Sequence, residues 1–294
     1  MTAASAQTPL RVFAPAKVNL CLHVTGKRED GYHLLDSLVV FAGVGDDVTV
    51  SPGQGLSLRI DGPNAPGLAA EPDNIVLKAA RFLAEAAGCA PDAALTLIKR
   101  LPVSSGIGGG SADAAAALRG LCGLWGLSPT AADLSALGLR LGADLPVCLA
   151  GIPARMQGVG ERIAPLPPLP SAWLVLVNPR IAVSTPAVFK ARQGGYAAPV
   201  ALPDRIAEFG DLVQLLLRTH NDLMPPAIWL APRIADVLSV LSARSGCALA
   251  RMSGSGATCW GLFSSETAAR QAAAAVAEQH PEWWVAPAPI LPPV

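Results

Sequence analysis

Apolar and polar residues alternate with a period of two through much of the first hundred positions, a pattern typical of half-buried strands. We predict such strands at residues 18–24, 47–51, 56–61 and 94–99. Between the last two, apolar residues three and four positions apart predict a helix at 74–87, with Asp73 as its N-cap and Gly88 at its end.

Helical and strand patterns also mix in irregular order after residue 110. Helices are expected at 112–124, 130–141, 211–217, 232–245 and 266–279, and strands between 151 and 179 and at 249–254, 257–263 and 283–285. Thr130 with Asp133 three residues later is typical of a helix start, and Gly142 of its end. Irregular order favours an α+β fold over a doubly wound parallel sheet.

Composition narrows the classes of function. The chain has 294 residues, of which 51% are hydrophobic and 15% charged, and its formal net charge is zero. Nothing resembles the basic stripe of a nucleic-acid binder, and no apolar run reaches the roughly 20 residues of a membrane-spanning helix. Residues 1–9 do not resemble a signal peptide, and the six cysteines form no CxxC motif. We expect reduced thiols, a cytoplasmic location, and no nucleic-acid or membrane partner.

The segment most informative about function is Pro-Val-Ser-Ser-Gly-Ile-Gly-Gly-Gly-Ser-Ala-Asp at 102–113. Four glycines within five positions let a backbone wrap an anion, and the helix that follows would add its positive N-terminal end. Walker A is excluded because no lysine follows Gly110, and the dinucleotide fingerprint because its spacing is absent. A plain turn between strand and helix would need only one glycine. The segment therefore predicts a phosphate site.

Four other segments carry candidate chemistry. Lys17 and Asn19 lie two residues apart on one face of an early strand. Asp30-Gly31-Tyr32-His33 is a predicted turn with one of the two tyrosines, and Gly142-Ala143-Asp144-Leu145-Pro146 places a carboxylate in an apolar stretch. Arg251 to Thr258 is a second loop of small residues. His23, His220 and His280 lie in no motif, and we interpret them as structural or solvated.

Together these segments resemble the GHMP kinase superfamily, over nearly the whole chain. Within it, the resemblance is to the members that phosphorylate the C2 hydroxyl of 4-diphosphocytidyl-2-C-methyl-D-erythritol, in the non-mevalonate isoprenoid pathway. Four segments narrow it together, by their order and spacing: Pro15-Ala16-Lys17-Val18-Asn19-Leu20, Asp30-Gly31-Tyr32-His33, Gly142-Ala143-Asp144-Leu145-Pro146, and Ser184-Thr185-Pro186 with Phe189. The resemblance implies a two-lobed α+β fold, with an N-terminal ATP-binding domain at 1–160 and a C-terminal domain at 161–294. It also implies a small-molecule kinase that uses ATP and Mg²⁺. For the oligomeric state we expect a monomer or a weak homodimer.

The resemblance also implies roles for individual residues. Asp144 is the expected base that takes the hydroxyl proton, and Lys17 its electrostatic partner. An aspartate before Pro146 could instead cap the next turn, and Lys17 could be a solvated strand lysine. The residues expected at ATP are Asn74, Lys99, Pro102, Ser104, Ser105, Gly106, Ile107, Gly108, Gly109, Gly110, Ser111 and Ala112. Those expected at the acceptor, besides Asp144, are Asn19, Tyr32, His33, Thr185 and Phe189.

Some questions stay open at the level of sequence. No carboxylate is evident as an Mg²⁺ ligand: Ser111 is one candidate, and Asp113 could instead cap its helix. Another GHMP kinase, acting on homoserine or mevalonate, is the nearest rival, although a small aliphatic acceptor has no use for an aromatic pair such as Tyr32 and Phe189. The rival from another class is a nucleotide-binding protein without catalysis, which the pairing of Lys17 with Asp144 disfavours.

Overall fold

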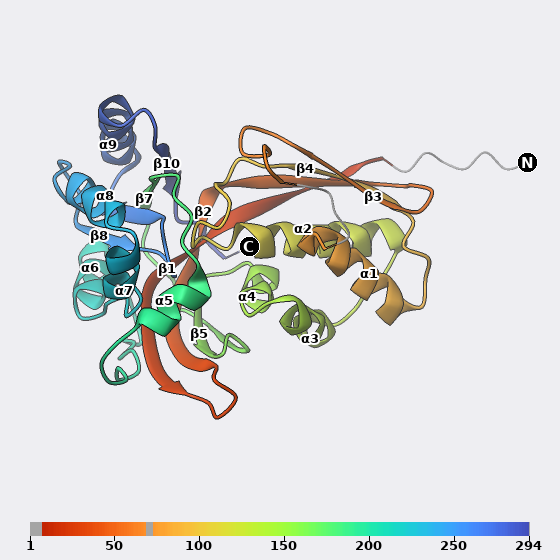
Figure 1. Cartoon of the computed structure of the whole chain (residues 1–294), viewed down its shortest axis with the longest axis horizontal. Helices are drawn as coiled ribbons and strands as arrows, with labels where there is room; N and C mark the ends of the chain where they lie inside the picture. Colours follow the sequence, from red (N-terminus) through yellow and green to blue (C-terminus); the bar gives the residue numbers. More distant parts are fainter. Residues whose placement is uncertain (1–7, 69–72, 294) are drawn as a thin grey trace, which may run out of the picture. The chain divides into compact units, whose positions relative to one another are not determined.

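The computed structural model describes residues 8–68 and 73–293. These form two compact units that interleave along the chain (Figure 1). Unit 1 contains the segment up to Pro15, Gly45–Leu101 and Gly109–Ala150, and unit 2 contains Ala16–Val44, Pro102–Gly108 and the chain from Gly151 onward. The strands β1 (Leu10–Lys27) and β2 (His33–Ser51) contribute residues to both units.

Unit 1 packs helices against a sheet. Its further elements are β3 (Leu56–Asp61), β4 (Ala93–Ile98), α1 (Ile75–Ala87), α2 (Gly109–Trp125), α3 (Ala131–Leu141) and α4 (Leu145–Ala150). Strand β4 pairs in parallel with β3 and antiparallel with the end of β2. Every second residue of β4 is buried, and the alanine-rich α2 buries most of its length beside α1 and α4. This packing fixes where the first turn of α2 lies.

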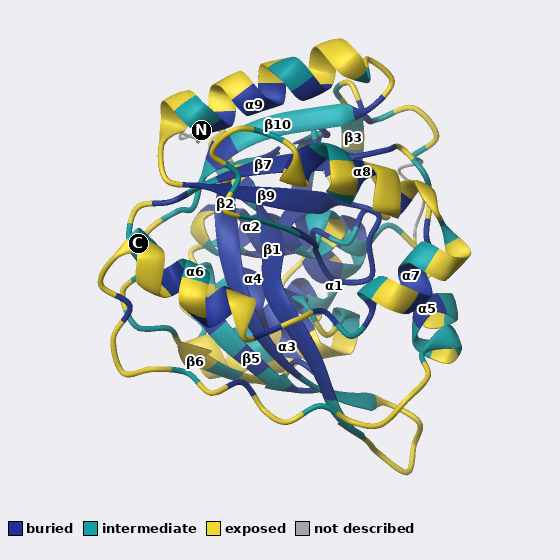
Figure 2. Ribbon diagram, turned by 90° about the vertical axis from the view of Figure 1, so that its left-hand side faces the viewer, coloured by how far each residue is buried: buried dark blue, intermediate teal, exposed yellow. Residues whose placement is uncertain are grey.

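Unit 2 is built on an antiparallel sheet in the order β10-β7-β9-β8. The strands of this sheet are β7 (Trp173–Asn178), β8 (Leu249–Met252), β9 (Cys259–Phe263) and β10 (Trp284–Pro289). Two further strands of unit 2, β5 (Ala154–Gly158) and β6 (Arg162–Pro165), continue the other sheet, in which β5 pairs with the first part of β2. Its helices are α5 (Thr185–Ala191), α6 (Phe209–Leu217), α7 (Met224–Leu230), α8 (Arg233–Ser242) and α9 (Glu266–Gln279). Figure 2 shows α9 along β10, with its buried side turned to the strands and its exposed side outward.

The α+β class predicted from the sequence is confirmed, and several boundaries need correction. The helix predicted from residue 112 begins at Gly109, so the last glycines of the loop already belong to its first turn. The N-cap of α1 is Asn74 and not Asp73, because the Asn74 side chain accepts the N–H of Val76 at 2.9 Å. The predicted capping box of Thr130 and Asp133 is present.

The cysteines and the lengths of the helices can also be compared with the sequence expectations. All six cysteines are free, as expected, although Cys89 is exposed. No helix in the described parts of the chain has the length and apolarity that a membrane crossing requires.

Candidate functional site

The first half of the glycine loop is held by its own backbone. In unit 2, the N–H of Lys17 donates to the carbonyl of Ile107 at 3.0 Å, and the N–H of Thr258 donates to the carbonyl of Ser105 at 3.0 Å. The hydroxyl of Ser253 donates to the carbonyl of Gly106 at 2.9 Å. Hydrogen bonds therefore hold the first half of the glycine loop against β1 and against the 253–258 loop.

Two glycines of this loop are required by conformation and space. Gly106 has φ +75°, and a Cβ there would lie 2.6 Å from the carbonyl oxygens of Ser253 and Gly256. Gly108 has φ +63°, and a Cβ there would lie 3.0 Å from the side chain of Lys17. Both are positions where L-residues with side chains are strained. Glycine is therefore needed at both positions because neighbouring atoms leave no room for a side chain.

The second half of the loop becomes the N-terminus of α2 in unit 1. Gly109, Gly110 and Ser111 form the first turn of this 17-residue helix. The first N–H groups of a helix have no partner within the helix, and the helix dipole makes this end positive. Ser111 is only partly buried, and the start of a helix is a favourable place for an anion.

A buried cluster of charges joins the strand before the loop to the helix after it. The ammonium of Lys99 lies 2.6 Å from a carboxylate oxygen of Asp46 and 2.6 Å from one of Asp113, and all three side chains are almost fully buried. The other oxygen of Asp46 accepts the N–H groups of Arg100 and Leu101. The main chain entering the loop and the first turn of α2 are therefore held by one set of ionic bonds.

The charges of this cluster do not balance, because two carboxylates share one ammonium. Burial raises the pKa of Asp113, and the Asp46 carboxylate adds to that effect while Lys99 opposes it. The second oxygen of Asp113 is buried without a hydrogen-bond partner in the described structure. Both observations favour the protonated form of Asp113 more than in an ordinary aspartate.

Two of the residues expected at ATP use their side chains to bond other residues of unit 1. Lys99, expected to line the adenine pocket, holds its ammonium between two carboxylates. Asn74, expected at the same pocket, caps α1 through its side-chain oxygen. A contact of either residue with adenine stays a prediction.

Lys17 and Asn19, both in unit 2, form a buried polar pair. The Lys17 ammonium donates to the Asn19 side-chain oxygen at 2.9 Å, and the Asn19 amide donates to the Ser37 hydroxyl at 2.7 Å. The main-chain N–H of Asn19 donates to the hydroxyl of Ser253 at 3.0 Å. Lys17 is therefore not the solvated strand lysine weighed as an alternative, and Asn19 orients its ammonium.

Asp144, in unit 1, precedes the short helix α4. Its carbonyl accepts the N–H of Cys148 at 3.2 Å, so its main chain starts that helix, and the residue is only partly buried. A carboxylate at this position is accessible enough to meet a substrate.

Two of the three aromatic residues expected at the acceptor, His33 and Phe189, lie against each other, and the binding of cytosine by all three stays a prediction. Phe189 stacks on His33, with ring centroids 4.8 Å apart, while Tyr32 is 64% exposed. Burial, followed by the positive charges of Lys27 and Arg192, lowers the pKa of His33. A neutral imidazole beside a phenyl ring offers both a flat face and a hydrogen-bonding edge.

Thr185 begins α5 and faces the 253–258 loop. Its hydroxyl lies 2.7 Å from that of Ser255, which is buried. No individual role was predicted for Ser255, and only its place in a loop of small residues could have indicated one. Asp46 was also missed, although an aspartate pair inside an apolar strand pattern is a signal of buried ionic bonding.

Among the described residues no group of three or more histidine, cysteine, aspartate or glutamate side chains is placed to hold a metal. Asp113 is bound to Lys99, and Ser111 stays a candidate ligand. This fits an ion that is held mainly by substrate phosphates and water, as is common for Mg²⁺.

Comparison with known proteins agrees with this geometry. Residues 74–151 match the GHMP kinases N terminal domain, and residues 203–282 match the GHMP kinases C terminal domain. The chain is 57% identical to a 4-diphosphocytidyl-2-C-methyl-D-erythritol kinase of Paramagnetospirillum magneticum, over 97% of this chain and 99% of the relative. The chain belongs to the GHMP kinase family.

Two further relatives of this GHMP kinase extend the comparison. The Rhodospirillum rubrum protein of the same name is 56% identical, over 92% of this chain and 89% of the relative. The crystal structure of a 4-(cytidine 5'-diphospho)-2C-methyl-D-erythritol kinase superposes with a TM-score of 0.77 at 34% identity, covering 95% of this chain and 99% of that one. The predicted family resemblance is thereby confirmed.

Proposed function

We propose that this GHMP kinase transfers the γ-phosphoryl group of ATP to the C2 hydroxyl of 4-diphosphocytidyl-2-C-methyl-D-erythritol, giving the 2-phosphate and ADP in the non-mevalonate isoprenoid pathway. The observation that carries the proposal is the identity of 57% over nearly the full length to a kinase named for that acceptor. The preformed glycine loop and the aromatic pair of His33 and Phe189 support the two halves of the reaction.

The donor phosphates bind at the loop from Pro102 to Ala112. Backbone N–H groups at the start of α2 and the Ser111 hydroxyl would contact the phosphate oxygens. Mg²⁺, when bound with ATP, would neutralise charge on the β- and γ-phosphates, with Ser111 as the protein ligand. Asn74 and Lys99 stay candidates for the adenine side.

The acceptor hydroxyl reacts without a covalent enzyme intermediate. Its oxygen forms a bond to the γ-phosphorus as the bond from phosphorus to the β–γ bridging oxygen breaks, and its proton passes to the carboxylate of Asp144. The ammonium of Lys17, oriented by Asn19, offsets the negative charge that develops during transfer. The leaving group is ADP.

The cytosine of the acceptor is recognised by His33, Phe189 and Tyr32. His33 and Phe189 are already stacked, whereas Tyr32 lies at an exposed turn and would cover the base on binding. Thr185, hydrogen-bonded to Ser255, and Asn19 line the path to the methylerythritol or diphosphate part. The 253–258 loop would shape this side.

Further aspects of the proposal rest on the sequence. The N-terminal domain at 1–160 and the C-terminal domain at 161–294 stay predictions, as do a cytoplasmic location and a monomer or weak homodimer. The absence of nucleic-acid and membrane partners also stays an expectation.

Acceptor choice can be tested directly. The purified chain is incubated with γ-labelled ATP and, separately, with 4-diphosphocytidyl-2-C-methyl-D-erythritol, homoserine or mevalonate. We expect labelled product with the first acceptor only. Equal or faster transfer to homoserine or mevalonate would contradict the proposed acceptor. Absence of transfer to all three, with ATP still bound, would favour a nucleotide-binding protein without catalysis.

A further inference from the structure

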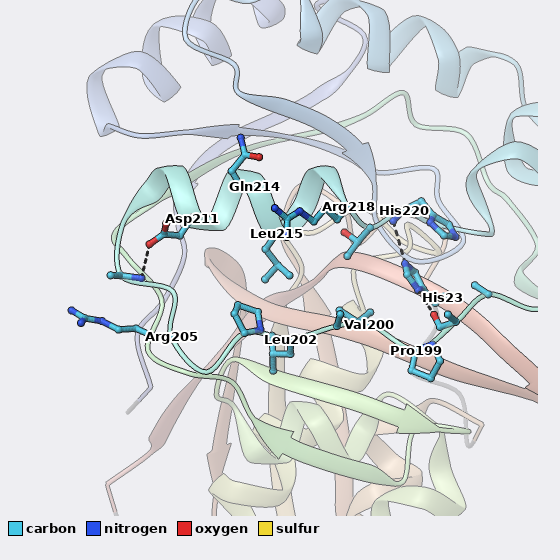
Figure 3. A pocket seen from close by; sticks show the side chains of 16 residues that line it. His23, Pro199, Val200, Leu202, Arg205, Asp211, Gln214, Leu215, Arg218 and His220 are labelled. Carbon is cyan, nitrogen blue, oxygen red and sulfur yellow. Dashed lines mark hydrogen bonds between the residues drawn. The ribbon is translucent and has the colours of Figure 1, made fainter.

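Unit 2 contains a pocket of about 800 Å³ that none of the predicted ATP or acceptor residues lines. It lies between α6 and the chain segment 197–207 (Figure 3). Val200 and Leu215, both buried, form part of its apolar lining, and His23 and His220 stand at one end. The volume is that of a site for a small organic molecule.

The wall formed by residues 197–200 is fixed to the body of unit 2. The N–H of Ala197 donates to the carbonyl of Val24 at 2.9 Å, and the carbonyl of Ala198 lies 2.8 Å from Nδ1 of His23. The N–H of Val200 donates to the buried carboxylate of Asp36 at 2.9 Å. Arg155 bonds both that carboxylate and the Val200 carbonyl. A ligand would therefore enter a preformed pocket, which limits the ordering that its binding must impose.

The pocket carries an excess of positive charge. Arg205 and Arg218 both line it, and neither has an ion-pair partner among the described residues. Asp211 is the one carboxylate in the lining, and it accepts the N–H groups of Ala207 and Glu208 at the start of α6. Figure 3 shows the Arg218 side chain beside Leu215, so that charge and apolar surface adjoin.

The aromatic end of the pocket offers a flat contact. The rings of His23 and His220 are stacked with centroids 4.1 Å apart, and His23 is buried while His220 is exposed. His220 is hydrogen-bonded to Asp222 at 3.0 Å, which fixes its ring. A planar group can thus lie against imidazole while a negative group meets a guanidinium.

We propose that this pocket binds a small organic anion with an apolar, planar body, at a site separate from that of the phosphoryl transfer. The stacked histidines and apolar lining take the body, and Arg218 takes the negative group. Because Arg218 is exposed, ionic strength should weaken the binding.

The probe for this site is 8-anilinonaphthalene-1-sulfonate, an aromatic sulfonate whose fluorescence rises in apolar surroundings. We expect saturable binding of one probe per chain, and much weaker binding of the uncharged N-phenyl-1-naphthylamine. Arg218→Gln should raise the dissociation constant about tenfold, since it removes a charge-assisted contact. Ala201→Trp, which fills the pocket from an exposed lining position, should abolish the binding.

The matched control is Arg162→Gln, an exposed arginine of unit 2 outside the pocket, which should leave the dissociation constant unchanged. Thermal unfolding of each variant shows whether it folds. Three results would overturn the proposal: no saturable binding, equal affinity in Arg218→Gln and the parent chain, or unchanged binding in Ala201→Trp. None of the three depends on whether the kinase reaction occurs.

Discussion

The two groups of residues expected to bind donor and acceptor differ in how firmly their side chains are bonded to the rest of the protein. On the donor side, Lys99 is buried between Asp46 and Asp113, and these bonds hold the main chain on either side of the glycine loop. On the acceptor side, His33 and Phe189 are stacked, but Tyr32 is mostly exposed on a turn.

The difference has a physical reason. A backbone phosphate site needs its N–H groups aimed before binding, because their positions supply the affinity, and buried ionic bonds can hold such a backbone. A base is recognised by stacking, which tolerates a side chain that closes on arrival. We therefore expect donor-side substitutions to affect folding most strongly. Among the acceptor-side substitutions, that of the exposed Tyr32 should affect binding alone, whereas Phe189 also packs against the hydrophobic core of unit 2.

The largest effect is expected for Lys99→Met. It leaves two buried carboxylates without their ammonium, which costs about 3–5 kcal/mol of stability. Thermal and urea unfolding measure the loss. Asp113→Asn is the matched variant: it keeps one ammonium opposite one carboxylate, so it should cost far less. Equal losses in the two variants would contradict the ionic account of the cluster.

The stability of Asp113→Asn at different pH values tests the charge state of the same buried cluster. Since burial raises the pKa of Asp113 in the folded chain, its favourable contribution is present at acid pH and declines as the pH rises through that pKa. The stability of Asp113→Asn relative to the parent chain should therefore improve from acid to alkaline pH. Urea unfolding at several pH values tests this. A relative stability that falls with rising pH would mean that the carboxylate is favoured when ionised.

Gly106→Ala should have the next largest effect on the donor side. The residue has φ +75°, and the Cβ of an alanine there would lie 2.6 Å from two carbonyl oxygens. We therefore expect strain of about 1–3 kcal/mol. The KM for ATP should rise together with the loss of stability. Gly195→Ala, at an open position where an added Cβ would have nothing within 4 Å, is the control. If both variants behaved alike, the loop would not be conformationally demanding.

Phe189→Ala should raise the acceptor KM with little change in the KM for ATP. Loss of a stacking face costs roughly 1–3 kcal/mol, about fivefold to 150-fold in affinity. Tyr32→Ala should act in the same direction without destabilising the protein, because the side chain is exposed. Steady-state kinetics with each substrate varied in turn would show it. An unchanged acceptor KM in both variants would mean that cytosine binds elsewhere.

The smallest expected effect is that of pH on the acceptor side. Because burial and the charges of Lys27 and Arg192 lower the pKa of His33, the ring stays neutral until the pH falls below the ordinary value of about 6.5. The acceptor KM should be flat above that value and rise below it. His33→Gln should remove the rise. A rise that survives in His33→Gln would assign the titration to another group.

Much of this structure could be predicted from local pattern. The capping box at Thr130, the glycine end at Gly88 and the buried alternation of β4 are set by neighbouring residues, so a short window of sequence contains them. The short helices α4, α5 and α7 were not predicted, because six or seven residues carry too little periodicity and depend on packing.

In the candidate site, too, some features follow from local sequence and others only from the fold. The glycines and Lys17 stand in motifs, whereas Asp46 acts through Lys99 and Asp113, which lie 53 and 67 positions away in sequence. Stacking of Phe189 on His33 likewise depends on the fold bringing α5 to the start of β2. Such pairings follow from tertiary structure and leave no local pattern.

The central claim is that Asp144 accepts the proton of the acceptor hydroxyl while Lys17 offsets the developing charge. Single-turnover transfer from γ-labelled ATP to 4-diphosphocytidyl-2-C-methyl-D-erythritol tests it in Asp144→Asn, with Asp236→Asn, an exposed aspartate of α8, as the matched control. We predict a rate constant at least about 100-fold lower in Asp144→Asn, with ATP binding retained, and an unchanged rate in Asp236→Asn. A rate near that of the parent chain in Asp144→Asn would contradict the account.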